Sequence, residues 1–203
     1  SVASRGLGDV YKRQPQRREY WDSRPLSTPL GWMYLAASEQ GLTRCVLGEN
    51  PTKTHAPGDS LHTNTAHQAP ELNGRIATEC PIPGMPTAAR NLCNLTRSQL
   101  EEYFAGARRS FRIPLDLSGS EFRRRIWQTC AAISYGQTRT YSQLAVEAGS
   151  PGAARAVGQA MHSNPVVIII PCHRVVAARG LGGYGPGIEI KQWLLDWERQ
   201  HGR

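Results

Sequence analysis

Pro171-Cys172-His173-Arg174-Val175 directly follows the apolar run VVIII at residues 166–170, and this stretch predicts how the chain carries a reactive sulfur. The β-branched run favours a buried strand, which would end at the proline. A thiol then stands next to an imidazole and a guanidinium, and positive groups nearby lower the pKa of a thiol. Cys172 is therefore a candidate nucleophile on a rigid support. The alternative is a small buried cysteine that only packs.

The composition limits the classes of partner. The 203 residues carry a net charge of +8, and nearly all of the cations are Arg. Arg suits phosphates and base edges, so nucleic acid is a natural partner, although charge alone would equally fit a solvated basic surface. No apolar run approaches the roughly 18 residues of a membrane span. The five cysteines form no CxxC pair, so neither a zinc site nor a disulfide framework is expected, and no cofactor is implied.

The N-terminal half predicts a small α/β domain over residues 21–113. Residues 1–20 are expected to be a disordered tail or sequence foreign to the natural protein. Residues 32–38 and 42–47 are apolar-rich runs joined by Glu39-Gln40-Gly41, which predicts a β-hairpin.

A Pro-rich stretch over residues 48–90 predicts a long irregular loop. After it, Thr96 and Gln99 form a capping-box pattern, which predicts a short helix that stops at Gly106. The histidines of the loop are expected to face solvent, with a metal site as the weaker alternative: His55, His62 and His67.

Residues 114–203 predict a second, mainly helical domain. Phe122, Ile126, Cys130 and Ile133 recur at helical spacing, so Cys130 is interpreted as a packing residue. Trp127 beside them is interpreted as core rather than as a platform for base stacking.

Two helices joined by a short turn are predicted next. Thr140 and Gln143 make a second capping box for a helix that ends near Ala148-Gly149, and Ser150 is expected to cap a following helix with Pro151 at its first position. This arrangement is typical of a helix-turn-helix. A generic two-helix hairpin is the alternative, and spacing alone slightly favours it.

The second of these helices is unusual for its small side chains. Residues 153–160 read AARAVGQA, with Arg155 as the single long cation. Small side chains let a helix approach a groove closely, and the amides at its N-terminus favour phosphate. The helix is therefore predicted to contact nucleic acid.

Residues 115–198 closely resemble the active-site domain of the O6-alkylguanine-DNA alkyltransferases, also called methylated-DNA-protein-cysteine methyltransferases. Besides the segment around Cys172, the matching motifs occur in the family's order: Glu121-Phe122, Ile126-Trp127, Ile133-Ser134-Tyr135-Gly136, Thr140-Tyr141, Arg155-Ala156-Val157-Gly158, Asn164-Pro165, Gly183-Tyr184 and Lys191 through Glu198.

The resemblance implies direct reversal of DNA damage. A single-turnover enzyme would move the alkyl group of O6-alkylguanine, and of O4-alkylthymine, irreversibly to Cys172. His173 would take the thiol proton through a water and Glu198 would orient His173, while Tyr141 would donate a proton to the base. From the residues alone, Glu198 follows an apolar stripe at helical spacing, which places it at the edge of the core; an exposed glutamate is the alternative.

The resemblance also implies a monomer that binds double-stranded DNA through the minor groove. It implies no association with a membrane. Arg155 would replace an extruded nucleotide, with Tyr141, Ala154 and Gly158 also at the DNA. The protein would act in a bacterial cytoplasm or a eukaryotic nucleus. The base would be held by four further residues: Asn164, Val175, Tyr184 and Gly185.

The loop Gly185-Pro186-Gly187 departs from the family's pattern, which has a small residue and then two glycines. Pro186 has no amide hydrogen to donate and stiffens the loop. Three alternative functions fit less well. An alkyltransferase-like lesion-binding protein would lack the nucleophile, a Cys-His hydrolase would need an oxyanion hole, and a regulator with a metal-binding sensor would need a cysteine cluster.

Overall fold

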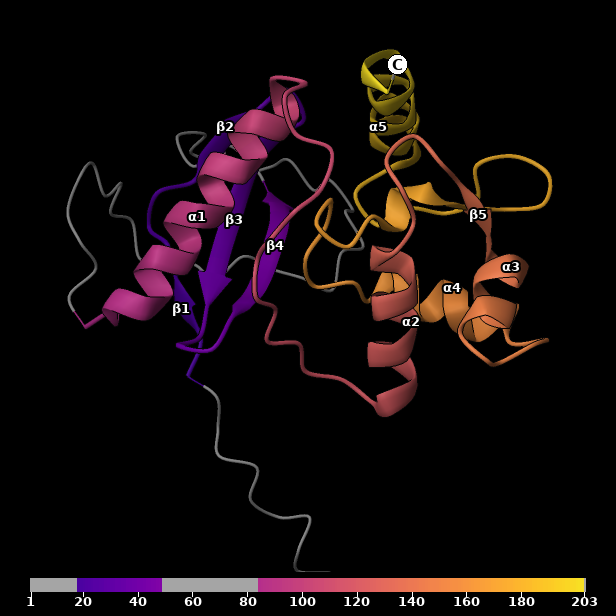
Figure 1. The fold of residues 1–203 in the computed structure, drawn as a ribbon, viewed down its shortest axis with the longest axis horizontal. Helices are drawn as coiled ribbons and strands as arrows, with labels where there is room; N and C mark the ends of the chain where they lie inside the picture. Colours follow the sequence, from indigo (N-terminus) through magenta and orange to yellow (C-terminus); the bar gives the residue numbers. More distant parts are fainter. Residues whose placement is uncertain (1–17, 49–83, 203) are drawn as a thin grey trace, which may run out of the picture.

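The computed structural model describes residues 18–48 and 84–202. Figure 1 shows a sheet with one long helix beside it, and a separate group of shorter helices that carries the C-terminal half. The predicted α/β class, with an N-terminal sheet region and a helical C-terminal domain, is confirmed. Of the expected tail over residues 1–20, residues 1–17 lie outside the described part of the chain, and Tyr20 already belongs to a strand.

The N-terminal sheet is antiparallel and has β3 at its centre. β3 (Gly31–Ala37) pairs with β1 (Tyr20–Trp21) and β2 (Leu26–Thr28) on one side and with β4 (Leu42–Gly48) on the other. The predicted hairpin is β3 and β4, whereas β1 and β2 are too short to show a pattern in the sequence.

The hairpin turn also anchors the segment that leads to the C-terminal half. Ser38 Oγ accepts from the amides of Gln40 and Gly41 at 3.1 and 3.3 Å, and it donates to Asp116 Oδ2 at 2.7 Å. A Cβ atom at Gly41 would lie 2.7 Å from the Asp116 nitrogen, so only glycine permits this approach. The turn therefore holds the segment between α1 and the C-terminal half against the sheet.

Helix α1 (Thr87–Phe104) is longer than predicted and packs on the sheet (Figure 1). The predicted start at Thr96 is wrong, because Thr96 lies inside α1, where its hydroxyl donates to the Leu92 carbonyl, whereas the predicted stop is right, since α1 ends at Phe104 and Gly106 follows with a φ of 74°. The end of the predicted 48–90 loop is also wrong, since Pro86 stands at the N-cap, where a missing amide hydrogen costs little. Residues 49–83, with the three loop histidines, lie outside the described residues.

The C-terminal half packs around Trp127. Its indole is 2% exposed and donates to the Ala160 carbonyl at 2.8 Å, and Cys130 beside it is fully buried, as predicted. The elements of this half follow in this order: α2 (Glu121–Ala131), β5 (Arg139–Thr140), α3 (Tyr141–Glu147), α4 (Ala154–His162), the 3-10 turn η1 (Cys172–Arg174), β6 (Val175–Val176) and α5 (Ile188–His201).

Helices α3 and α4 form the predicted two-helix unit, with one error. The capping box of Thr140 and Gln143 is present, but α4 begins at Ala154 and not at Pro151. Gly152 has a φ of +84°, which no helix accepts, and the Ser150 hydroxyl accepts from Arg125 of α2 at 3.2 Å instead of capping.

The strand predicted for residues 166–170 is wrong. Val166 forms an isolated bridge to Cys45 of β4, where the Val167 amide donates to the Cys45 carbonyl at 2.9 Å. The chain then bends so that the Ile170 amide donates to the Val166 carbonyl at 3.0 Å. Ile168 has a φ of 72°, a strained value for a β-branched residue. The β-branched composition thus reflects burial on all sides and not strand pairing.

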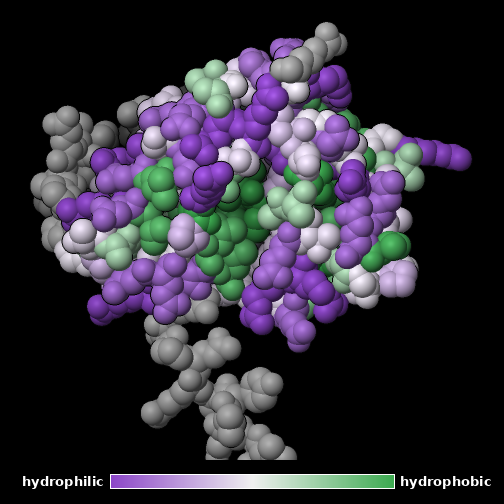
Figure 2. Space-filling view, viewed as in Figure 1, coloured by the Kyte–Doolittle hydropathy of each residue, from purple (hydrophilic) through white to green (hydrophobic). Residues whose placement is uncertain are grey.

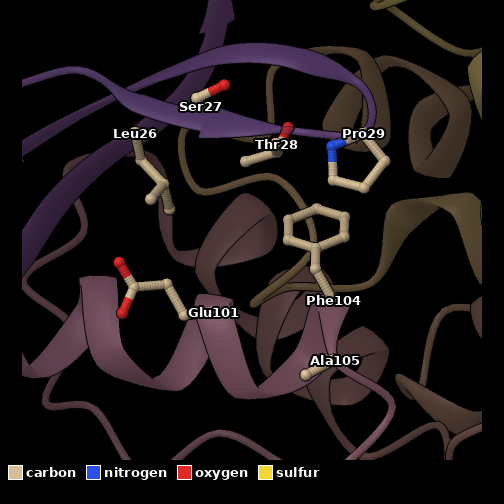
Figure 3. A pocket seen from close by; sticks show the side chains of 7 residues that line it. All are labelled: Leu26, Ser27, Thr28, Pro29, Glu101, Phe104 and Ala105. Carbon is tan, nitrogen blue, oxygen red and sulfur yellow. The ribbon is translucent and has the colours of Figure 1, made fainter.

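The surface view places apolar side chains near the middle of this face, with mostly hydrophilic side chains around them (Figure 2). Within residues 18–48 and 84–202, no helix is both long and apolar enough to cross a bilayer. A pocket of about 280 Å³ lies between β2 and the end of α1, where the ring of Phe104 lies below Pro29 (Figure 3). None of the residues predicted for chemistry is among those that line this pocket. The lining residues are Leu26, Ser27, Thr28, Pro29, Glu101, Phe104 and Ala105.

Candidate active site

Cys172 begins the turn η1, just after the bend at residues 166–170. Its side chain is almost fully buried, and Asn164 Nδ2 donates to its Sγ atom at 3.0 Å. The same amide group donates to the Ile170 carbonyl at 2.8 Å, and Asn164 Oδ1 accepts from the Val166 amide at 3.0 Å. One side chain therefore holds both the bend and the sulfur.

The thiol is neutral in the resting protein. Burial raises the pKa of Cys172, while the hydrogen bond from Asn164 and the charge of Lys191 oppose that rise. The expectation that the adjacent cations would lower this pKa below its ordinary value is wrong. The Arg174 guanidinium points to Glu198 and not to the sulfur, and His173 itself is kept neutral.

Glu198 accepts hydrogen bonds from four residues in three parts of the chain. It lies on α5, is fully buried, and accepts five hydrogen bonds of 2.8 to 3.0 Å. Burial disfavours its charge, but the hydrogen bonds from His173 and Arg174 and the charge of Arg174 outweigh burial and hold the pKa of this carboxyl far below its usual range. Its donors are Tyr103 Oη, His173 Nε2 and Arg174 Nη2 at Oε1, and Arg174 Nε and the Gly136 amide at Oε2.

This carboxylate fixes the tautomer of His173. Glu198 is ionised and can only accept, so Nε2 of His173 carries the hydrogen of their 2.8 Å bond. Nδ1 then holds the free lone pair, and it is buried without a hydrogen-bond partner in the described residues. Burial lowers the pKa of His173, the bond to Glu198 opposes this, and Arg174 adds to the lowering. The imidazole is therefore a neutral base with an open acceptor.

Tyr141 lies against Gly182 and Gly183, which directly precede Tyr184 and Gly185 of the predicted base site. Its hydroxyl donates to the Gly183 carbonyl at 3.2 Å, and a Cβ atom at Gly182 would lie 2.9 Å from its ring. Burial raises the pKa of Tyr141, and the neighbouring Cys172 adds to the rise. The Tyr184 hydroxyl is buried without a partner in the described residues, and Gly185 lies in the turn that follows.

The predicted contact surface of α4 is open. Arg155 is exposed and forms no ion pair or side-chain hydrogen bond within the described ranges. A Cβ atom at Gly158 would meet nothing within 4 Å, and Ala154 is partly exposed. The helix therefore presents backbone and small side chains with one unpaired cation.

Comparison with known proteins decides the family. Residues 121–200 match the family model described as 6-O-methylguanine DNA methyltransferase, DNA binding domain. A methylated-DNA–protein-cysteine methyltransferase of Methanosarcina barkeri is 36% identical over 177 residues, which cover 87% of this chain and 96% of that protein. The chain belongs to the methylated-DNA–protein-cysteine methyltransferase family.

Other members of the methyltransferase family support this assignment. The crystal structure of Mycobacterium tuberculosis OGT in complex with DNA superposes with a TM-score of 0.67 at 34% identity, over 89% of this chain and 93% of that one. The methyltransferase of Mycolicibacterium paratuberculosis is 55% identical over 104 residues, 51% of this chain. The chain spans less than two thirds of that mycobacterial relative, 63% of its length.

Three residues of this methyltransferase-family site were not assigned from the sequence. Arg174 was interpreted only as a charge near the sulfur, and it instead neutralises Glu198. Lys191, quoted only within a motif, is buried and donates to the Val175 and Gly183 carbonyls at 2.6 and 3.1 Å; burial lowers its pKa to about 8. Tyr103 reaches the site from the N-terminal half, and no local pattern could have indicated it.

No residue cluster for a metal occurs in residues 18–48 and 84–202. Pro186 lies in a turn that the Gly187 amide closes on the Tyr184 carbonyl at 3.1 Å. Gly187 has a φ of 115°, and α5 starts directly after it. The turn that contains Pro186 therefore ends at a glycine with positive φ, directly before α5.

Proposed function

We propose that this chain repairs DNA by direct reversal, as a methylated-DNA–protein-cysteine methyltransferase that acts once. Cys172 sulfur attacks the alkyl carbon of O6-alkylguanine, the new S–C bond forms as the C–O6 bond breaks, and the electron pair of that bond goes to the guanine. The observation that carries the proposal is the buried Cys172 thiol, held by Asn164, beside a His173 base that Glu198 fixes in one tautomer. O4-alkylthymine is expected as a second substrate.

The proton of the thiol is proposed to move to His173 before attack. Nδ1 of His173 has the lone pair that the Glu198 bond leaves free, and a bridging water would connect it to Sγ. The imidazolium then lies against an ionised carboxylate, which stabilises it. Because the thiol pKa is raised by burial, the relay supplies a thiolate that solvent would not supply at neutral pH.

The leaving guanine needs its developing negative charge neutralised. Tyr141 is the proposed proton donor to the base, since its hydroxyl lies at the rim of the pocket and stays protonated at neutral pH. The Tyr184 ring would form a wall, the Gly185 amide would donate toward O6, and the carbonyl oxygens of Cys172 and Val175 would accept from the exocyclic amine. The Val175 carbonyl already accepts from Lys191 and has a second lone pair for this bond.

The substrate is proposed to be alkylated guanine in double-stranded DNA. A base inside a stacked duplex does not reach a buried sulfur, so the nucleotide must leave the stack. Helix α4 would enter the minor groove with Ala154 and Gly158 close to the backbone, and Arg155 would fill the space of the extruded nucleotide. The similar M. tuberculosis protein was crystallised with DNA, which supports DNA as the partner. The chain is expected to act as a monomer wherever the cell keeps its DNA.

The stoichiometry of the reaction tests this proposal. A thioether has no ready hydrolytic route back to the thiol, so the protein mixed with excess O6-methylguanine duplex should transfer a single methyl group per chain and then stop. Mass spectrometry should locate the added methyl on the peptide that contains Cys172. Continued turnover would indicate a hydrolase, and lesion binding without transfer would indicate an alkyltransferase-like protein; either result contradicts the proposal.

A further inference from the structure

Tyr103 connects the N-terminal half of the molecule to the proton relay. It lies near the end of α1, and Figure 1 shows this end of α1 beside α5. Its side chain is fully buried, and its hydroxyl donates to Glu198 Oε1 at 2.8 Å. Burial raises the pKa of this phenol, and the Glu198 charge adds to the rise, so it remains a donor at every working pH.

Tyr103 and His173 donate to the same oxygen of Glu198, Oε1. Glu198 Oε1 accepts from His173 Nε2 and from Tyr103 Oη, both at 2.8 Å. Donors that share one carboxylate oxygen each draw negative charge toward themselves, and the potential at His173 is therefore weaker than a less occupied carboxylate would give. The number of donors on Oε1 thus affects how readily His173 takes up a proton.

We propose that Tyr103 is a positioning residue of the transfer reaction, which sets the proton affinity of His173 through its hydrogen bond to Glu198 Oε1. The inference rests on the proposed function for the reaction it concerns, but the bond itself is a property of the folded protein. The hydroxyl holds the carboxylate in place and limits its charge, so that His173 stays neutral and able to accept the thiol proton at physiological pH.

The other charged and titratable groups around this pair are accounted for. Arg174 occupies both oxygens of Glu198 and is present in every variant below. Lys191 acts electrostatically on both Cys172 and His173, and neither Lys191 nor Cys172 is substituted in these variants. Tyr135 lies close to Glu198, with its ring 6.0 Å from that of Tyr103, but its hydroxyl has no hydrogen-bond partner in the described part of the chain.

The test is the titration of His173 by NMR in the full chain labelled at histidine ring carbons, with the signal assigned by its loss in His173→Gln. In Tyr103→Phe the midpoint should move upward by about half a pH unit to one unit, because a charge-assisted bond to the carboxylate is lost. Tyr135→Phe is the matched control, since it removes a nearby hydroxyl that does not touch Glu198, and its midpoint should equal that of the wild type.

The pH dependence of single-turnover transfer to free O6-benzylguanine is the second measurement. Protonated His173 cannot accept the thiol proton, so the acid limb of the rate profile should move to higher pH in Tyr103→Phe by the same amount as the NMR midpoint. If the chain transfers no alkyl group at all, the proposed function fails while the NMR titration still tests the role of Tyr103.

Two further variants separate this role from simple packing. Phe104→Ala loosens the same contact between α1 and α5, where the Phe104 and Trp193 rings lie 6.3 Å apart, without removing a donor to Glu198. It should leave the midpoint unchanged. 3-Fluorotyrosine at position 103 is a stronger donor on an almost unchanged ring, and it should move the midpoint downward. Equal midpoints in wild type and Tyr103→Phe, or equal shifts in Tyr103→Phe and Phe104→Ala, would overturn the proposal.

Discussion

The buried charges of the proposed relay around Glu198 are paired, whereas the exposed helix α4 carries a charge that is unpaired among the described residues. Around Glu198 every charge meets a partner at 2.8 to 3.0 Å, and the carboxylate accepts five hydrogen bonds. On α4, Arg155 is exposed and makes no such bond with the described residues. The residues proposed for the chemistry are thus held in place without a substrate, whereas the surface proposed to contact DNA keeps its cation free for an external partner.

The largest effect should come from the sulfur itself. Cys172→Ser replaces a polarizable nucleophile with a hydroxyl whose pKa is far higher, so transfer should be abolished on free O6-benzylguanine and on alkylated duplex alike. Binding to the alkylated duplex should persist, because α4 is unchanged. Gel-shift and single-turnover assays measure the two properties, and loss of DNA binding in this variant would mean that the two regions are not separable.

Glu198→Gln should be the most damaging change to the stability of the buried region. It leaves the Arg174 guanidinium buried without a countercharge, which costs about 3 kcal/mol of the free energy of unfolding. In the wild type the folded pKa of Glu198 is depressed, so its stabilisation is complete above the unfolded pKa and is lost as pH falls toward the folded value. Urea unfolding from pH 7 down to pH 3 should show this loss in the wild type and a flatter dependence in the variant.

His173→Ala should slow transfer roughly 100-fold at neutral pH, the scale of a general base, on both substrates. The loss should shrink at higher pH, where hydroxide removes the thiol proton without the relay. Single-turnover rates across pH measure this recovery. Parallel profiles for wild type and variant would remove His173 from the proton path and would leave Glu198 with a purely structural role.

Arg155→Ala should impair the contact of α4 with DNA and leave the chemistry at Cys172 unchanged. Extrusion of a base costs a few kcal/mol, and a tenfold change corresponds to 1.4 kcal/mol, so transfer from alkylated duplex should fall roughly 10- to 100-fold. Reaction with free O6-benzylguanine needs no extrusion and should keep the wild-type rate. Equal losses on both substrates would show that Arg155 acts on the fold or on the chemistry and not on the duplex.

The smallest effect concerns undamaged DNA. Its binding should be weak, independent of sequence and sensitive to salt, because phosphate neutralisation supplies most of the affinity. Arg155→Ala should reduce the slope of log affinity against log salt by at most about 0.9, the value of one neutralised phosphate, because the variant removes one exposed cation from the proposed DNA surface. Fluorescence anisotropy between low and high salt measures the slope. If the affinity of the wild type did not change with salt, binding through phosphate contacts of basic side chains would be contradicted.

The sequence predicted the features that neighbouring residues determine. The capping box at Thr140 needs a pattern of four residues, and the hairpin of residues 32–47 needs two apolar runs and a turn, so both were visible without a structure. The bend at residues 166–170 was not visible, because its cause is an amide of Asn164 that competes with strand pairing. Composition cannot show whether a buried backbone group bonds to a neighbouring strand or to a side chain such as Asn164.

The candidate site divides in the same way. Cys172 and His173 are neighbours in the chain, and the motif order pointed to Glu198, which the structure places 2.8 Å from the imidazole. Tyr103 lies 95 residues before Glu198, and its contact depends on how α1 packs beside α5. A contact of that kind follows from the tertiary fold alone. The roles of these residues in transfer stay predictions until the variants are measured.

The two hydrogen bonds of Asn164 Nδ2 have a consequence for the protein after the proposed transfer. The same amide group donates to the sulfur of Cys172 and to the carbonyl of Ile170, so an alkyl group on the sulfur would be expected to displace the side chain that closes the bend. That bend contains Ile168 at a strained φ of 72°. A consumed copy should therefore lose order in a buried apolar segment that an unused copy keeps packed.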